Sequence, residues 1–175
     1  METYAERIER IRAEYREARA RFGARLRDAT DAAVHRVPEG GGWSAAQIGW
    51  HVAAVDASFA ALLGPDSPAA KPLADGEPAR TWPEVVASMP AKLEAGRRVQ
   101  PPEDVRREDV LASLDDSARK LDAALASLSE ERASGFAITH PAIGTVALGQ
   151  IGEWATAHVA RHNAQAKRTL AAAGS

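Results

Sequence analysis

Apolar residues recur at alternating steps of three and four along two long stretches of the chain, which is the period of an amphipathic helix. One stretch predicts a first helix over residues 4 to 34, and the other predicts a third helix over roughly residues 107 to 130. The first stripe consists of Ile8, Ile11, Tyr15, Ala18, Phe22, Leu26 and Ala29. The later stripe consists of Leu111, Leu114, Ala118, Leu121, Leu125 and Leu128. Each helix therefore presents one apolar face to a core and its charged residues to solvent.

The second helix is predicted from its capping signals. Ser44 followed by Gln47 matches a capping box, and Trp43 and Ile48 on either side of the cap can form a hydrophobic staple. The helix then continues to about Leu63, where a Gly-Pro pair ends it. We therefore expect Ser44 to be the N-cap residue.

The fourth helix is expected to start near Thr145 or Val146 and to end before Gly174. In the segment before it, Pro141 and Gly144 disfavour helix and favour a turn, so we expect a loop there. No strand-like alternation of useful length is visible anywhere.

The segment from about residue 64 to 106 differs from the rest because it holds eight of the ten prolines. Within it, Thr81 can still cap a short helix that runs through Ala95 with a kink at Pro90. We interpret the segment as a crossover that lets the second and third helices run parallel. The prediction is an all-α fold, with residues 1–175 forming a single four-helix-bundle domain that has one long crossover between helices 2 and 3.

Composition argues against several classes of function. The 22 basic and 24 acidic residues are interspersed, with a net charge of −2, so there is no concentrated positive field to bind nucleic acid. Because cysteine is absent, His, Asp and Glu are left as the strong metal ligands. The N-terminal residues lack the features of a secretion signal, and no stretch of about 18 apolar residues occurs. We therefore expect a cytoplasmic protein that binds neither nucleic acid nor a membrane.

Three of the five histidines can converge on one metal ion. His158 and His162 are four residues apart, so they share a face of the fourth helix with Cβ atoms about 5–6 Å apart. His51 lies two turns into the second helix, on the side expected to face inward. Three imidazoles around Zn²⁺ or Ni²⁺ leave a coordination position open for water or substrate. The pattern thus favours a divalent-metal site that can do chemistry or bind a small molecule.

The histidine pattern also has simpler explanations. A pair at this spacing arises easily by chance, and a lone inward histidine is more often a hydrogen-bonded core residue than a ligand. The glutamate that follows the first histidine in zincin metalloproteases is missing, because Val159 follows His158. Taken alone, the spacing leaves a metal site and a polar core network open.

Several other residues are candidates for a pocket wall or for contacts with the ligand imidazoles. Gln150 and Trp154 precede His158 on the same predicted ridge, and Gln47 lies one turn before His51, although capping is its favoured role.

His140, in the loop before the fourth helix, is expected to structure that loop or to line the pocket rim. His35 is expected to serve the surface or a helix end. Asp56 and Glu153 each lie five residues from a proposed ligand, about 140° around the helix, so no catalytic base is identified.

Three sequence motifs of the chain, taken together, resemble those of the DinB-like (DinB/YfiT-like) proteins. They are Trp43-Ser44-x6-His51, His140-Pro141-x2-Gly144 and His158-x3-His162-x2-Gln165, which occur in the order and with the spacings of that family. The resemblance covers nearly the whole chain. It implies a four-helix bundle with a long crossover, often a homodimer, that holds a divalent metal through His51, His158 and His162.

Relatives in the family look like metal-dependent hydrolases, or like transferases and isomerases that use a low-molecular-weight thiol such as bacillithiol or mycothiol. The resemblance therefore implies a small-molecule substrate and, for the transferase type, a thiol co-substrate. Two other hypotheses stay open. One is a bundle that binds a metal or a small ligand without catalysis, and the other is a helical interaction domain in which the histidines are core residues and no metal binds.

Overall fold

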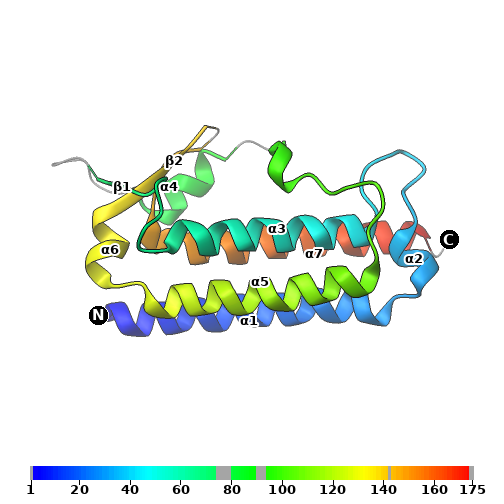
Figure 1. Ribbon diagram of the computed structural model, residues 1–175, viewed down its shortest axis with the longest axis horizontal. Coiled ribbons are helices and arrows are strands. Elements are labelled where there is room, and N and C mark those ends of the chain that lie inside the picture. The colour runs from blue at the N-terminus through cyan, green and yellow to red at the C-terminus, as the bar shows by residue number, and fades with distance from the viewer. Residues whose placement is uncertain (1, 74–79, 90–93, 142, 174–175) are drawn as a thin grey trace.

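Four long helices lie side by side in the computed structural model, which describes the chain apart from residues 1, 74–79, 90–93, 142 and 174–175 (Figure 1). They are α1 (Tyr4–Asp28), α3 (Ala45–Leu63), α5 (Arg107–Ser127) and α7 (Ile151–Ala173). Helices α1 and α3 each pack against both α5 and α7. The all-α prediction is therefore confirmed. The largest fully buried side chains are Tyr15, Phe22, Ile11, Leu26, Ile48, Leu121, Leu125, Leu148 and Ile151.

The first helix is shorter than its apolar stripe predicts. It ends at Asp28, and a separate helix α2 (Asp31–His35) follows. The break comes from Thr30, whose extended backbone cannot continue α1 and whose hydroxyl accepts a hydrogen bond from the Ala33 N–H. The prediction of one helix to residue 34 was therefore wrong, because a threonine that can cap a new helix interrupts it.

Helix α3 begins as predicted. Ser44 is its N-cap, and the reciprocal bonds of the capping box join Ser44 and Gln47. By length and composition α3 could cross a membrane, since its most apolar window has a mean hydropathy of 1.2, but half of that window is buried inside the protein. It also carries the buried polar side chains His51 and Asp56. The helix is thus packed as a core helix.

The segment between α3 and α5 is a crossover, and both helices run in the same direction, as expected (Figure 1). It contains β1 (Lys71–Pro72), α4 (Trp82–Ala87) and the short 3₁₀ helix η1 (Arg97–Val99). Thr81 and Glu84 form the capping box of α4, but this helix ends at Ala87 and does not reach Ala95. The proposed kink at Pro90 lies outside the described residues.

The segment before the last helix was predicted as a loop, and this was wrong. After the short helix α6 (Glu130–Gly135), strands β2 (Phe136–His140) and β3 (Gly144–Ala147) form an antiparallel hairpin that β1 extends to three strands. Gly144 has φ +77°, which the tight return of the chain requires. The 3₁₀ helix η2 (Leu148–Gln150) follows, so α7 starts at Ile151 and not near residue 145. The strands are too short for their alternation to stand out in the sequence.

Two glycines let the helices that carry the histidines approach their neighbours closely. A Cβ atom on Gly49 of α3 would lie 2.7 Å from Leu26 and from Val110, and one on Gly152 of α7 would collide with Ile11. Both sites exclude any side chain because the interior is already close-packed. Helices α3 and α7 are thereby held at a fixed distance from α1 and α5.

Candidate metal site

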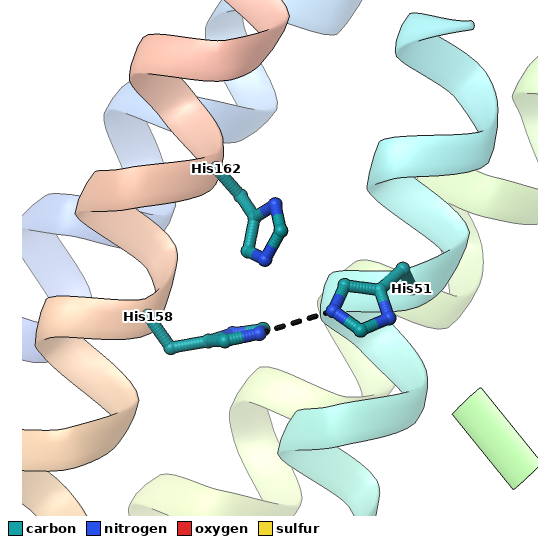
Figure 2. A group of neighbouring side chains, drawn as sticks. All are labelled: His51, His158 and His162. Atoms are coloured by element: carbon teal, nitrogen blue, oxygen red, sulfur yellow. Dashed lines mark hydrogen bonds between the residues drawn. The ribbon is translucent and has the colours of Figure 1, made fainter. Parts of the chain in front are cut away.

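The structure brings the three proposed ligands together. His51 on α3 faces His158 and His162 on α7, and all three rings point into the space between these helices (Figure 2). The Nε2 atoms of His51 and His158 are 3.1 Å apart. One ring nitrogen from each histidine lies within 4.8 Å of the others. His51 and His162 are buried, and His158 is half-buried.

Two of the rings are oriented by hydrogen bonds at their outer nitrogens. His51 Nδ1 lies 2.7 Å from the Val99 carbonyl oxygen, and His162 Nδ1 lies 2.8 Å from Gln165 Oε1. Because a carbonyl oxygen only accepts, each Nδ1 carries the proton and donates it. In the neutral ring Nε2 then keeps its lone pair. Outer bonds of this kind fix the tautomer and the ring plane of metal-binding histidines.

Burial makes the three histidines neutral at pH 7. It lowers the pKa of His51 and, together with the neighbouring His162 and His51, brings the pKa of His158 well below its usual range. Burial, with a smaller contribution from His51, lowers the pKa of His162 to about 4. A histidine must be neutral to bind a metal, so these pKa shifts prepare the cluster for an ion.

The donor set fits a divalent transition metal. Two imidazole nitrogens bound tetrahedrally at about 2.0–2.1 Å from one Zn²⁺ lie about 3.3 Å apart, close to the separation of the His51 and His158 Nε2 atoms. Among the described residues, the group of side chains that could hold a metal ion consists of these three histidines and includes no carboxylate. Three imidazoles leave at least one position for a water or a substrate.

The model of the DinB superfamily matches residues 14–166. This range contains most of α1 and all of α3, α5 and the three histidines. The chain belongs to the DinB superfamily. No significant match was found among curated proteins or among solved structures. Membership agrees with the helical fold and is compatible with a metal site at the three histidines, but it does not assign a reaction.

Neither hydrogen-bond partner of the histidines was predicted as such, although Gln165 is part of the motif His158-x3-His162-x2-Gln165. Val99 belongs to η1 in the crossover, so the crossover lies against the site and supplies a backbone carbonyl. Every residue type has such a carbonyl, and no sequence signal marks it. Gln165 did have a signal, because its spacing of three from His162 places both side chains on one helix face.

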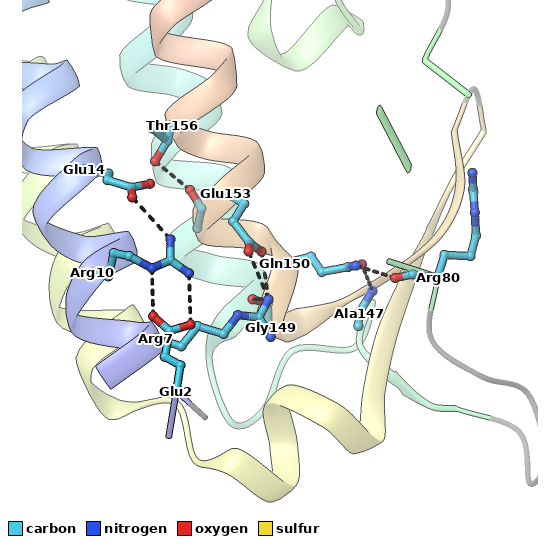
Figure 3. A network of polar contacts seen from close by, with 11 residues as sticks. Glu2, Arg7, Arg10, Glu14, Arg80, Ala147, Gly149, Gln150, Glu153 and Thr156 are labelled. Atoms are coloured by element: carbon cyan, nitrogen blue, oxygen red, sulfur yellow. Dashed lines mark hydrogen bonds and ion pairs between the residues drawn. The ribbon is translucent and has the colours of Figure 1, made fainter. Parts of the chain in front are cut away.

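Neither glutamine among the predicted pocket residues bonds a ligand histidine. Gln47 donates to the carbonyl oxygens of Pro102 and Glu103, which ties the crossover to the start of α3. Gln150 lies in η2 and not on α7, where it accepts from the Ala147 N–H and donates to the Arg80 carbonyl oxygen (Figure 3). Both side chains therefore fasten segments that flank the bundle.

Trp154 and His140 form an aromatic group next to the histidines. Trp154 is buried one turn before His158, and its ring contacts Phe59 with centroids 5.0 Å apart. His140, at the end of β2, packs edge-on against Trp154 at 5.4 Å. The ring contacts of His140 in the described part of the chain include Trp154 but none of the three clustered histidines. This placement agrees with a wall or rim residue more than with a ligand.

Both nearby carboxylates are engaged by arginines. Glu153 pairs with Arg7 at 3.0 Å (Figure 3), and Asp56 pairs with Arg19 at 3.1 Å inside the core. His35 bonds the Asp31 carbonyl oxygen in the last turn of α2, the helix-end role expected for it. Neither of these two carboxylates is therefore free to act as a base beside the histidines.

Proposed function

We propose that the protein is a divalent-metal-dependent enzyme whose ion is held by Nε2 of His51, His158 and His162. One observation carries the proposal: the outer nitrogens of His51 and His162 both donate to carbonyl oxygens, so their Nε2 lone pairs remain available within the cluster. The borderline character of imidazole favours Zn²⁺ or Ni²⁺.

A divalent ion bound in this way supplies a Lewis acid that lowers the pKa of a bound water or thiol towards neutrality. We therefore propose a reaction of the hydrolase type or of the low-molecular-weight-thiol transferase type, with a small electrophilic substrate. The chain contributes the neutral imidazoles and the orienting oxygens of Val99 and Gln165. With Asp56 and Glu153 paired to arginines, acidification of the nucleophile is the main activation available.

The first test is metal content. Protein purified without a metal-affinity tag should bind close to one equivalent of Zn²⁺, Ni²⁺ or Mn²⁺ by elemental analysis after supplementation and dialysis. The variant His158→Ala/His162→Ala, prepared in the same way, is the control and should bind far less. A wild-type content below about 0.1 equivalent under every condition would sink the proposal.

The second test is turnover. Metal-loaded protein and the double variant would be screened against activated esters, lactones and electrophiles supplied with low-molecular-weight thiols. Metal-dependent ester or lactone cleavage would identify a hydrolase, and metal-dependent consumption of the thiol would identify a transferase. Stable metal binding without turnover of either kind would favour the non-catalytic metal- or small-ligand-binding bundle.

A further inference from the structure

A second polar cluster is buried in the bundle beside the histidines, formed by Tyr15 and Arg19 of α1 and Asp56 of α3. The Tyr15 hydroxyl donates to Asp56 Oδ2 at 2.6 Å, and Arg19 Nε lies 3.1 Å from the same oxygen. Arg19 Nη2 donates to the Leu114 carbonyl oxygen of α5. Asp56 is completely buried and Arg19 is 7% exposed. The Asp56 carboxylate is therefore bound through one oxygen only.

The other polar atoms of this region are buried without a partner among the described residues. They include Asp56 Oδ1, Arg19 Nη1 and His158 Nδ1, and also Arg19 Nε, whose 3.1 Å approach to Asp56 Oδ2 is an ion pair without hydrogen-bond geometry. Leaving such atoms unpaired is unfavourable, so native proteins satisfy nearly all of them, with ordered water where protein groups do not reach. Three of the four residues with such atoms in the described part of the chain belong to this one region.

The packing of α1 on α7 places Arg19 opposite His158. These two helices run in parallel, and their contacts join residues 141 apart near one end, Ile11 with Gly152, and 138 apart at the other, Arg25 with Asn163. The same register midway along α1 pairs Arg19 with the turn of α7 that carries His158. The positive charge of Arg19 accordingly contributes to the low pKa of His158.

The packing of α3 on α7 places Asp56 at the same level. Along these antiparallel helices His51 meets His158, and Phe59 meets Trp154. Asp56 lies between His51 and Phe59 in the sequence, so it lies at the level of the α7 turn between Trp154 and His158. Arg19, Asp56 and His158 thus belong to one layer of the bundle.

We propose that one internal water molecule joins His158 Nδ1, Asp56 Oδ1 and Arg19 Nη1. The water accepts a hydrogen bond from Arg19 Nη1 and donates one to Asp56 Oδ1. Its second hydrogen and its second lone pair are then available to His158 Nδ1. Three bonds to protein groups are typical of a buried water. Through this water Asp56 and Arg19 are positioning residues for His158, as Val99 is for His51 and Gln165 is for His162. The consequence for metal binding rests on the function proposed above.

A water suits this position because it serves both tautomers of His158. When Nε2 binds a metal, Nδ1 must carry the proton, and the water accepts it. Without a metal, His158 Nε2–H can donate to the lone pair of His51 Nε2, 3.1 Å away, and Nδ1 then accepts a proton from the water. A carboxylate in direct contact could only accept, so it would support the first arrangement alone.

The water is tested on metal-free protein, independently of whether a metal binds. A high-resolution crystal structure should show an ordered water within hydrogen-bond distance of His158 Nδ1 and Asp56 Oδ1. The imidazole ¹⁵N signals of His158 should shift in the variant Arg19→Met/Asp56→Leu, whereas those of His162 should not. This variant replaces the buried ion pair with apolar groups of similar size, a change that proteins often tolerate. A direct protein contact at Nδ1, or ¹⁵N signals of His158 unchanged in the variant, would overturn the proposal.

The positioning role is tested by competitive zinc titration. Asp56→Asn and the double variant should lower zinc affinity about tenfold or more, the usual effect of losing a partner of a ligand histidine. Tyr15→Phe is the matched control, because its hydroxyl bonds the other oxygen of Asp56. It should lower stability and leave zinc affinity unchanged. Equal losses in all three variants would show a purely structural cluster. If the wild type binds no zinc, the proposed function fails, while the crystal and ¹⁵N measurements still decide on the water.

Discussion

Two clusters of buried polar side chains lie side by side in this bundle, and they are stabilised in opposite ways. In one, Arg19 and Asp56 neutralise each other and Tyr15 donates to the carboxylate. In the other, three histidines are kept neutral by burial, and two of them point lone pairs at a common space. In the first cluster the charges of Arg19 and Asp56 balance without a bound ion. The second offers lone pairs to a cation, which is why we assign the metal to it.

We expect the largest effect on metal affinity from replacing a proposed ligand histidine. His158→Ala or His162→Ala should lower metal affinity by at least about a hundredfold, because each removes one of three nitrogen ligands. His35→Ala is the control, since His35 lies in α2 and bonds the Asp31 carbonyl oxygen. Competitive titration with a chromogenic chelator measures all three. Equal affinity in all three variants would refute the assignment and remove the contrast between the clusters.

Substitutions in the cluster of Tyr15, Arg19 and Asp56 should instead lower the free energy of unfolding. Asp56→Ala leaves Arg19 buried without its carboxylate and should cost about 3–5 kcal/mol in the free energy of unfolding. Tyr15→Phe removes one hydrogen bond and should cost about 1 kcal/mol. Urea denaturation of metal-free protein compares them. A cost below about 1 kcal/mol for Asp56→Ala would mean that the ion pair contributes little.

The pH dependence of stability should have opposite signs in the two clusters. Burial lowers the pKa of His162 from 6.5 to about 4, so as pH falls through this window the unfolded chain takes up a proton that the folded protein does not. The free energy of unfolding should fall by on the order of 3 kcal/mol from this group alone. Burial raises the pKa of Asp56 from 3.8 to about 6, against the opposing effect of Arg19, so the folded protein takes up that proton first and gains stability as pH falls.

Denaturation of metal-free protein at several pH values between about 4 and 7 can separate these contributions. His162→Gln should flatten the loss of stability towards low pH, and Asp56→Asn should steepen it. If both variants changed the slope in the same direction, the two clusters would not titrate as their burial indicates.

We expect the smallest effect on metal affinity from removing a hydrogen bond that orients a histidine ring. Gln165→Leu removes the acceptor of the His162 Nδ1 proton and should weaken metal binding about tenfold. Asn163→Ala is the matched control, because Asn163 is on the same turn of α7 but bonds Arg25. The same chelator titration applies. An effect of Asn163→Ala as large as that of Gln165→Leu would point to a general disturbance of α7.

The outcome of each sequence prediction depended on how local its signal was. The capping boxes at Ser44 and Thr81 were visible because all their partners lie within three residues. The hairpin before α7 was not, because its four-residue strand β3 is stable only when paired with β2. The break at Thr30 was missed for a related reason, since the apolar stripe continues across a residue that can either extend one helix or cap the next.

The candidate site divides in the same way. His158, His162 and Gln165 share one helix, so their common face follows from spacing alone. Val99 and the Arg19–Asp56 pair join the site from other elements, and no local pattern links them to the histidines. Gln150 shows the converse error, since its step of four from Trp154 predicted a place on the ridge, whereas it precedes α7 in a 3₁₀ turn.

By itself the sequence determined the helical class, the inward faces of the long helices and which three histidines are candidates for a metal. These properties depend on periodicity and on spacing within one element, which short-range geometry dictates. Only the tertiary structure decided that the histidine nitrogens meet within 4.8 Å, that a crossover carbonyl orients His51, and that an arginine and an aspartate lie at the level of His158. Contacts between elements depend on the register and distance of packed helices, which the close approaches at Gly49 and Gly152 help to set.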